Sequence, residues 1–354
     1  MNVASAISIQ DAHQKVTRLY ALDLLRGICA VMVAAYHFNL WSNLAEPPIV
    51  RGFMAFWGLY GVSIFFILSG YSLAYSYGQT FSSEITPARF ARYMKRRAGR
   101  IAPLFVGVLA LSIAGKIATS HNDISAAQIL SNATLLFGLY DPSDTPVIGG
   151  WSIGIEMVFY LILPYLIIAR KSAAALMAIV LLVSWQTTAG LAQFPSLEAG
   201  WKSYVGPSNH FIFFASGAFM ALLATRRSAQ PGWRLLLSLG LMSVAIAWIC
   251  SGKSELDLVT SWARLALVGI SILVVYLSSQ WKPPIAAITA CDRLGGLSYA
   301  MYLIHPLVFF GASVFGAVSG GAMAALFFVC IAIASLVDIY LDRPTQALVK
   351  RLGW

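Results

Sequence analysis

The chain has 354 residues, of which 59% are hydrophobic and 11% are charged, and its formal net charge is +10; its mean hydropathy is +0.75. About 25% of the residues of a typical soluble domain are charged, so this composition excludes an ordinary soluble protein and indicates a polytopic membrane protein. The first 18 residues are mixed and polar, and the apolar run after them is too long for a cleavable signal peptide. The four cysteines lack metal-ligand spacing, so we expect neither a disulfide framework nor a metal site.

Ten apolar stretches have about the twenty residues that a helix needs to cross a bilayer. They cover residues 19–40, 53–77, 101–119, 151–169, 173–192, 207–225, 235–252, 260–278, 294–312 and 321–340. The sequence therefore predicts an all-α polytopic membrane protein with about ten transmembrane helices. Residues 1–18 are the predicted N-terminal segment, 19–340 a single transmembrane domain, and 341–354 a C-terminal tail.

The basic residues of the loops predict the orientation. If the N-terminus is cytoplasmic, 18 of the 24 Lys and Arg residues fall on the inner side. These are Lys15, Arg18, Arg89, Arg92, Lys95, Arg96, Arg97, Arg100, Arg170, Lys171, Arg226, Arg227, Arg234, Lys282, Arg293, Arg343, Lys350 and Arg351. By the positive-inside rule both termini are cytoplasmic. The positive net charge is thus a topology signal, and nothing in it suggests nucleic acid.

The first span carries three polar residues, Asp23, Arg26 and His37. At 1.5 Å and 100° per residue, Arg26 and His37 lie on one helical face, about 16 Å apart along the axis, and Asp23 lies one turn before Arg26. A charge at mid-bilayer costs about 2.5–3.5 kcal/mol, so this stripe must face a polar interior. It predicts a functional site; the alternative is an ion pair that only holds helices together.

The inner loop 78–100 carries six basic residues in its last twelve positions. Two interpretations stay open: attraction to anionic lipid headgroups, and a site for a phosphate-rich ligand, since Arg binds phosphate oxygens bidentately. In the second interpretation the candidate ligands are Lys95, Arg96, Arg97 and Arg100. Arg96 and Arg100 are one turn apart, and Pro103 follows them at the start of the third span.

The fourth span opens with Trp151, and Ser152, Glu156 and Tyr160 follow at intervals of four on one helical face. A carboxylate at this depth must be paired or protonated. Under the predicted topology Glu156 and His37 both lie in the outer half of the membrane. We therefore expect a carboxylate–imidazole pair that orients His37 for proton transfer.

The ninth span carries Ser298, Tyr302 and His305 on one face. Pro306 removes the hydrogen bond to the Tyr302 carbonyl, and broken helices are tolerated where they line a cavity. His305 either bonds a neighbouring helix or has a catalytic or substrate role. His210, at the outer end of the sixth span, is a further candidate.

Five segments form an ordered set: LDLLRG with His37 (22–37), GVSIFFILSGY (61–71), KRRAGRIAPLF (95–105), WSIGIEMVFY (151–160) and SYAMYLIHPLV (298–308). In this order they resemble the motifs of the acyltransferase 3 family of bacterial integral-membrane O-acyltransferases, of the exopolysaccharide and O-antigen acetyltransferase type. Two positions depart from the pattern. His210 stands where the family suggests Arg, and Asp342-Arg343-Pro344 replaces Glu-Lys-Pro.

The resemblance implies an acyltransferase domain over residues 19–340 in the bacterial inner membrane. It implies transfer of an acyl group, usually acetyl from acetyl-CoA, to a hydroxyl of an extracytoplasmic or lipid-linked carbohydrate. Acyl-CoA is then a co-substrate, no metal is needed, and the lipid bilayer and polysaccharide assembly machinery are the other expected partners. The particular glycan, the acyl group (acetyl or succinyl) and the oligomeric state stay open.

Together the residues and the resemblance predict a mechanism. The CoA phosphates bind the basic cluster through Arg96 and Arg100, and the pantetheine arm passes Arg26 towards His37. His37, oriented by Glu156 or Asp23, acts as general base on the acceptor hydroxyl or assists a covalent relay. The candidate substrate contacts are Trp151, Ser152, Tyr302, His305 and His210.

Two other function classes stay open. One is a proton-coupled transporter, although the second half of the chain does not repeat the motifs of the first, as an inverted repeat would. The other is a membrane sensor that binds acyl-CoA or sugar without turnover. Thioester hydrolysis by the purified protein distinguishes an enzyme from both.

Overall fold

The computed structural model describes residues 18–42, 46–119, 123–224, 231–316 and 320–351. This part of the chain is helical and contains no β-sheet. The elements are α2 (Tyr20–Trp41), α3 (Pro48–Tyr77), α4 (Pro87–Ala118), α5 (Ala126–Ala133), α6 (Phe137–Tyr140), α7 (Gly150–Ile168), η1 (Ala169–Ser172), α8 (Ala173–Leu191), α9 (Trp201–Tyr204), α10 (Pro207–Leu223), α11 (Gly232–Cys250), α12 (Glu255–Thr260), α13 (Trp262–Gln280), α14 (Ile285–Ser313), α15 (Gly320–Val337), η2 (Asp338–Asp342) and α16 (Arg343–Arg351).

Each of the ten predicted spans falls on a long helix, so the prediction of an all-α polytopic membrane protein is confirmed. Eight helical stretches within the described ranges are long and apolar enough to cross a membrane. One of them, Gly150–Leu191, contains both α7 and α8, and α10 has only 17 residues. The count of ten crossings and the cytoplasmic placement of the termini stay predictions.

Helix α4 begins earlier than expected. The segment 78–100 was predicted to be a loop, but from Pro87 onward it is helical and continuous with the third span. Proline is suited to the first helical turn, and the Thr86 hydroxyl caps the helix by accepting from the Arg89 amide at 3.4 Å. Arg and Lys are also good helix formers. Hydropathy locates the lipid-spanning part of a helix, and it does not register a polar helical extension.

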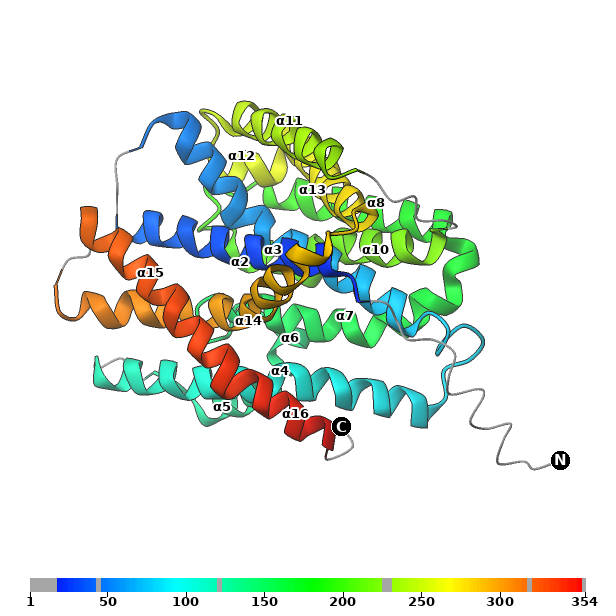
Figure 1. The fold of residues 1–354 in the computed structure, drawn as a ribbon, viewed down its shortest axis with the longest axis horizontal. Coiled ribbons are helices and arrows are strands. Elements are labelled where there is room, and N and C mark those ends of the chain that lie inside the picture. Colours follow the sequence, from blue (N-terminus) through cyan, green and yellow to red (C-terminus); the bar gives the residue numbers. More distant parts are fainter. Residues whose placement is uncertain (1–17, 43–45, 120–122, 225–230, 317–319, 352–354) are drawn as a thin grey trace.

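The centre of the bundle contains two close helix crossings, α3 with α10 and α2 with α14. At the first, a Cβ added to Gly70 would clash with the Phe214 backbone, and one added to Gly217 would clash with the Ile67 backbone. Small residues of this kind let membrane helices approach backbone to backbone. Around this centre, α4 and α5 lie along one side, α11 to α13 along the other, and α15 runs obliquely across the face towards α16 (Figure 1).

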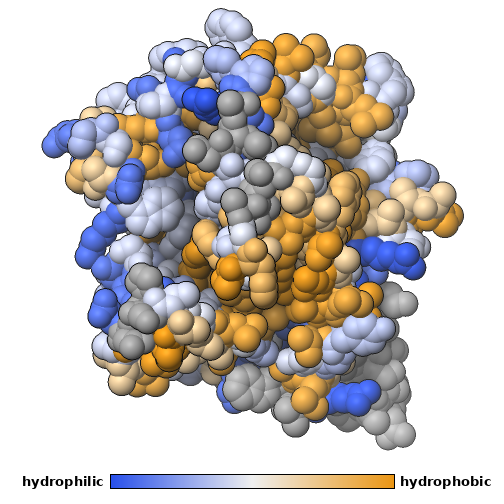
Figure 2. Space-filling view, turned by 90° about the vertical axis from the view of Figure 1, so that its left-hand side faces the viewer, coloured by the Kyte–Doolittle hydropathy of each residue, from blue (hydrophilic) through white to orange (hydrophobic). Residues whose placement is uncertain are grey.

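The surface carries the apolar side chains that a bilayer would cover. Seen from the side on the left of Figure 1, broad apolar areas lie beside polar ones (Figure 2). Among the described residues, exposed large apolar side chains occur along α4, α8, α11 and α15, for example Leu111, Leu182, Trp248 and Phe328. Exposed apolar surface on this scale marks contact with a membrane or a partner, and the length of the helices identifies the membrane. The chain is a multi-pass membrane protein.

Candidate active site

A cavity of about 360 Å³ lies among α2, α3, α4, α7 and α14. Charged and hydroxyl side chains line it, including Asp23, Arg26, Ser69, Ser72, Arg97, Arg100, Ser152, Glu156, Tyr160, Tyr299 and Tyr302. All five motifs singled out in the sequence contribute residues to this lining. The cavity therefore brings together most of the predicted site residues, and its volume lies in the range of small-molecule pockets.

Arg26 is fixed at the cavity wall by a network that joins α2 to α3. Its Nη1 donates to Asp23 Oδ1 at 2.9 Å, and its Nη2 donates to the Ser72 hydroxyl at 2.7 Å and the Leu68 carbonyl at 3.2 Å. The Asp23 carboxylate also accepts from Arg18 Nε at 2.8 Å. Asp23 thus binds two arginines at the start of α2, and it does not reach His37.

Glu156 lies on the cavity wall and accepts two hydroxyl hydrogen bonds on one oxygen, Oε1. The donors are Ser69 and Tyr160, the latter at 2.5 Å. The predicted pair of Glu156 with His37 is not formed. Tyr302 in mid-α14 donates to the Gly149 carbonyl, so α7 begins deep in the bundle. Glu156 is six residues after the start of α7 at Gly150, and therefore about 9 Å further along the helix axis, in the direction away from His37. A helix that started at the membrane surface would have placed Glu156 and His37 at similar depth.

His37 is paired with His305 instead. His37 Nδ1 lies 2.9 Å from the Val33 carbonyl and 3.2 Å from His305 Nε2, while His305 Nδ1 lies 3.1 Å from the Met301 carbonyl. Trp41 stacks on both imidazoles, with centroid distances of 4.9 and 5.8 Å. This pattern assigns the hydrogen of each ring to Nδ1. His305 then accepts through Nε2, and His37 Nε2 keeps a lone pair with which to take up a proton.

Ser152 and Tyr302 mark the end of the cavity nearest the two histidines. The Ser152 and Tyr302 hydroxyls lie 2.8 Å apart, and each is 3.0 Å from the Gly149 carbonyl. Gly149 has a φ of +79°, a conformation that favours glycine. His305 is three residues, less than one turn, beyond Tyr302, so the cavity ends about one helical turn from the His37–His305 pair.

Two predicted substrate residues, Trp151 and His210, do not line the cavity. They lie in a buried aromatic cluster with Tyr204. The His210 ring is 5.1 Å from Trp151 and 5.0 Å from Tyr204, and its Nε2 lies 2.9 Å from the Tyr204 carbonyl. Only 1% of His210 is exposed. These residues pack the bundle beside the cavity, and neither lines it.

The predicted phosphate ligands divide into two pairs. Arg97 and Arg100 line the cavity, whereas Lys95 and Arg96 are exposed and do not. Arg97 donates to the Tyr77 hydroxyl at 3.4 Å and lies over that ring, and its Nε is buried without a hydrogen-bond partner in the described structure. Arg100 Nη1 binds both oxygens of Asp342, at 2.8 and 3.1 Å. The structure therefore makes Arg97 and Arg100 the candidate phosphate ligands. Arg96, which the sequence had favoured, is not one of them.

Arg264 on α13 is a buried residue that sequence reasoning left without a role. It is 4% exposed and donates to the Val259 carbonyl at 3.1 Å and to the carbonyl and side-chain oxygens of Asn209 at 2.9 and 2.8 Å. Its guanidinium thus lies beside His210, where the family pattern suggested an arginine. An arginine within a span was the available signal, but the sequence did not show which helix it faced.

An ion pair connects two segments on the predicted outer side. Lys202 Nζ lies 2.6 Å from Asp141 Oδ2. Burial alone would raise the pKa of Asp141, but hydrogen bonds from Lys202 and Ser143 outweigh it and lower that pKa below its ordinary value. The same hydrogen bond raises the pKa of Lys202. The pair ties the loop before α7 to α9.

Comparison with known proteins identifies relatives along nearly the whole chain. A family model described as "Acyltransferase domain" matches residues 19–341. Nodulation protein 10 of Rhizobium leguminosarum bv. viciae is 27% identical over 319 residues, 81% of this chain and 82% of that protein. Acyltransferase MdmB of Streptomyces mycarofaciens is 26% identical over 387 aligned residues, 95% of this chain and 94% of the relative.

A third relative matches only in part. The putative peptidoglycan O-acetyltransferase YrhL of Bacillus subtilis (strain 168) is 29% identical over 180 residues, which is 46% of this chain and 26% of that protein. No solved structure gives a significant match.

Proposed function

Since the chain belongs to the acyltransferase 3 family and is a membrane O-acyltransferase, we propose that it transfers an acetyl group from acetyl-CoA to a carbohydrate hydroxyl. The observation that supports this most is the course of the cavity. It begins at the arginines of α4, passes Arg26 and Glu156, and ends at Ser152 and Tyr302, one turn from the histidine pair.

The donor end of this proposal rests on charge. Among the arginines that line the cavity, Arg18 and Arg26 are paired with Asp23, and Arg100 with Asp342. Within the described part of the chain Arg97 forms no ion pair; it donates to the Tyr77 hydroxyl and lies over that ring. Its positive charge therefore has no carboxylate partner, and it suits an incoming CoA phosphate. The acyl-pantetheine arm then occupies the cavity, with the thioester towards Ser152 and Tyr302.

The acceptor end rests on His37. In the proposed step, His37 Nε2 takes the proton of the acceptor hydroxyl while the hydroxyl oxygen attacks the thioester carbonyl carbon. The new C–O bond forms, the C–S bond breaks, and the thiolate of CoA leaves and takes a proton from the His37 imidazolium. The products are the O-acyl carbohydrate and CoA with a free thiol, so protons and electrons balance. His305 accepts the Nδ1 hydrogen of His37 and holds the ring in orientation.

The predicted orientation supports a carbohydrate that the enzyme meets at the outer side. In that orientation Arg97 lies near the cytoplasmic end of α4, where acetyl-CoA is available, and His37 lies near the outer end of α2. Donor and acceptor then approach from opposite sides of the bilayer. The transfer is direct in this proposal, and the bacterial inner membrane is the location that it requires.

Two measurements test the proposed function. Purified protein in lipid nanodiscs, supplied with acetyl-CoA and with glycan from a deletion strain as acceptor, should release free thiol, and His37→Ala protein should not. Surface glycans of a deletion strain should be lighter by one acetyl group per site than those of the strain complemented with the wild-type gene. Equal glycan masses, or no thiol release by protein shown to be folded, would rule out the proposed reaction.

A further inference from the structure

The inner end of α15 passes into a π-helical turn, η2, that carries two buried carboxylates. Asp338 and Asp342 are each 4% exposed. Burying a carboxylate is costly unless it is paired and hydrogen-bonded, and π-turns within helices occur frequently at functional sites. The two carboxylates therefore need partners, and each has a different one.

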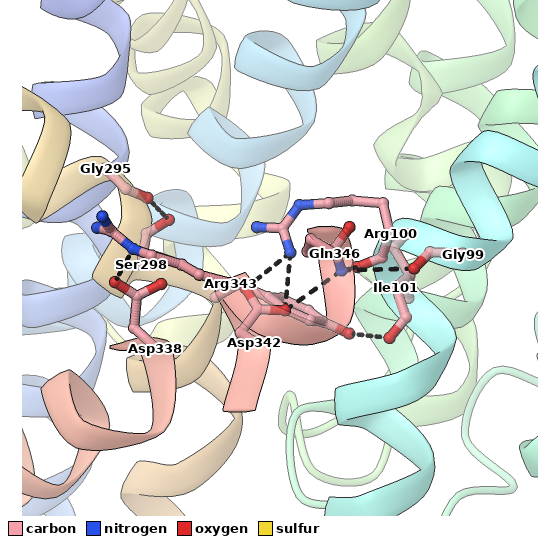
Figure 3. A network of polar contacts seen from close by, with 10 residues as sticks. Gly99, Arg100, Ile101, Gly295, Ser298, Asp338, Asp342, Arg343 and Gln346 are labelled. Atoms are coloured by element: carbon pink, nitrogen blue, oxygen red, sulfur yellow. Dashed lines mark hydrogen bonds and ion pairs between the residues drawn. The ribbon is translucent and has the colours of Figure 1, made fainter. Parts of the chain in front are cut away.

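The two pairs point to different places. Asp338 accepts from Arg343 Nε at 2.8 Å, a contact between η2 and the adjoining α16, and neither residue lines the cavity. Asp342 accepts from Arg100 of α4, which does line it. Figure 3 shows the Arg100 guanidinium and the Asp342 carboxylate facing each other, with Gln346 alongside and the Asp338–Arg343 pair apart from them.

The planar guanidinium group of Arg100 is held at one edge by Asp342 and on one face by the Tyr299 ring. Only its Nη1 binds Asp342, and its guanidinium carbon lies 5.2 Å from the centre of the Tyr299 ring. The Tyr299 hydroxyl donates to the Ile101 carbonyl at 2.7 Å, which fixes that ring against α4. Nη2 and Nε of Arg100 form no hydrogen bond within the described part of the chain, so the second edge of the fork is available.

Gln346 of α16 holds the carboxylate in place. Its side-chain amide donates to the Arg100 carbonyl at 2.9 Å and to Asp342 Oδ1 at 3.3 Å. The last helix is thereby connected to the same turn of α4 that presents Arg100.

We propose that Asp342 is a positioning residue, which with Gln346 directs the free edge of Arg100 into the cavity to bind a phosphate of the acyl-CoA donor. This inference rests on the proposed function, because it takes the cavity to be the donor site. It gives the Asp-Arg-Pro segment a role in the reaction: its aspartate acts on the donor through an arginine 242 positions earlier in the chain.

The test compares two matched variants, Asp342→Asn and Asp338→Asn, with acetyl-CoA and with acetyl-pantetheine, which has no nucleotide phosphates. Asp342→Asn should raise the KM for acetyl-CoA about tenfold, since a charge-assisted bond that holds Arg100 becomes a neutral one. The KM for acetyl-pantetheine should stay unchanged. Asp338→Asn removes an equally buried carboxylate from the same turn, and it should leave the ratio of the two KM values as in the wild type.

A double variant separates positioning from general damage. Adding Asp342→Asn to Arg100→Ala should change the KM for acetyl-CoA no further, because Asp342 acts through Arg100. If Asp342→Asn does not fold, Gln346→Met leaves the ion pair in place and should shift the KM in the same direction by a smaller factor. A lower KM in Asp342→Asn, or an equal change for both donors in folded protein, would overturn the positioning role.

The same measurements distinguish the positioning role of Asp342 from the proposal that the cavity binds acyl-CoA. If Arg97→Ala and Arg100→Ala raise the KM for acetyl-CoA and Asp342→Asn does not, the donor site stands and the positioning role is wrong. If neither arginine variant changes that KM, the donor site is wrong, and the role of Asp342 falls with it.

Discussion

His37 and His305 lie side by side, with Nδ1 of the first 3.2 Å from Nε2 of the second. Two imidazolium ions at this separation would repel each other, so the pair holds at most one extra proton near neutral pH. A proton taken up by His37 Nε2 leaves His305 neutral and still able to accept from Nδ1. The pair thus couples a base that accepts a proton to a partner that keeps the ring in one orientation.

Replacing His37 by alanine should abolish transfer with little effect on folding. Loss of a general base typically lowers the rate about 10²–10⁴-fold. We expect kcat for acetyl transfer to fall by this factor while the thermal unfolding midpoint in detergent stays close to wild type. Near wild-type acetylation of glycan by His37→Ala would remove His37 from the mechanism.

Replacing His305 by alanine should have a smaller effect, and only in the presence of His37. One lost hydrogen bond to the His37 ring corresponds to about a tenfold fall in kcat. The double variant His37→Ala/His305→Ala should be no slower than His37→Ala, because residues that act as a unit are not additive. Multiplied effects in the double variant would instead show that His305 acts independently.

The choice of arginines on α4 gives a test with a control one residue away. Arg97→Ala should raise the KM for acetyl-CoA by about ten- to a hundredfold, as expected for loss of a charge-assisted bond of about 1.5–3 kcal/mol. Arg96→Ala should leave it unchanged, since Arg96 is exposed and does not line the cavity. The KM values would be measured by thiol release in nanodiscs with the glycan acceptor present. Equal effects of the two variants would instead indicate that the basic residues of α4 only set the membrane orientation and bind lipid headgroups.

The predicted orientation can be checked by labelling in intact cells. The four native cysteines are buried, so a membrane-impermeant thiol reagent should report on introduced cysteines. Ser251→Cys, after α11, should react from outside, and Ser83→Cys, before α4, should react only after the cells are permeabilised; both serines are exposed. The opposite pattern would invert the topology and exchange the donor and acceptor sides.

The Asp141–Lys202 pair predicts a defined pH dependence. The lowered pKa of Asp141 means that the pair contributes to stability above the ordinary aspartate pKa of about 4, and that this contribution is lost as pH falls through the lowered value. The unfolding midpoint of wild-type protein should therefore exceed that of Asp141→Asn at pH 5–7, and the difference should decrease as the pH falls below about 4. A constant difference over this range would exclude the ion pair as its cause.

The sequence predicted the helices well because a bilayer requires long apolar segments, and such segments can be recognised from the residue types alone. It also predicted that Arg26, Glu156, Arg100, Ser152 and Tyr302 belong to one site, since polar residues inside such runs must share a polar interior. The cavity gathers these residues.

The sequence could not predict which polar side chains form hydrogen bonds or ion pairs with each other. The sequence placed Glu156 and His37 at the same depth, yet α7 starts beside Tyr302, in the middle of α14. Asp342 lies 242 positions from Arg100, and no periodicity within either helix relates the two. Pairings of this kind depend on how helices pack, and a single sequence contains that information only indirectly.

The crossing of α3 and α10 constrains how the protein can work. At Gly70 and Gly217 the two backbones touch without side chains between them, so there are no rotamers to absorb a sliding or rocking motion. We therefore expect these two helices to move as one rigid body during turnover. We expect reactants to enter and leave past the other helices that line the cavity, α2, α4, α7 and α14. In the proposed reaction, an acetyl group would therefore cross the bilayer while α3 and α10 keep their relative positions.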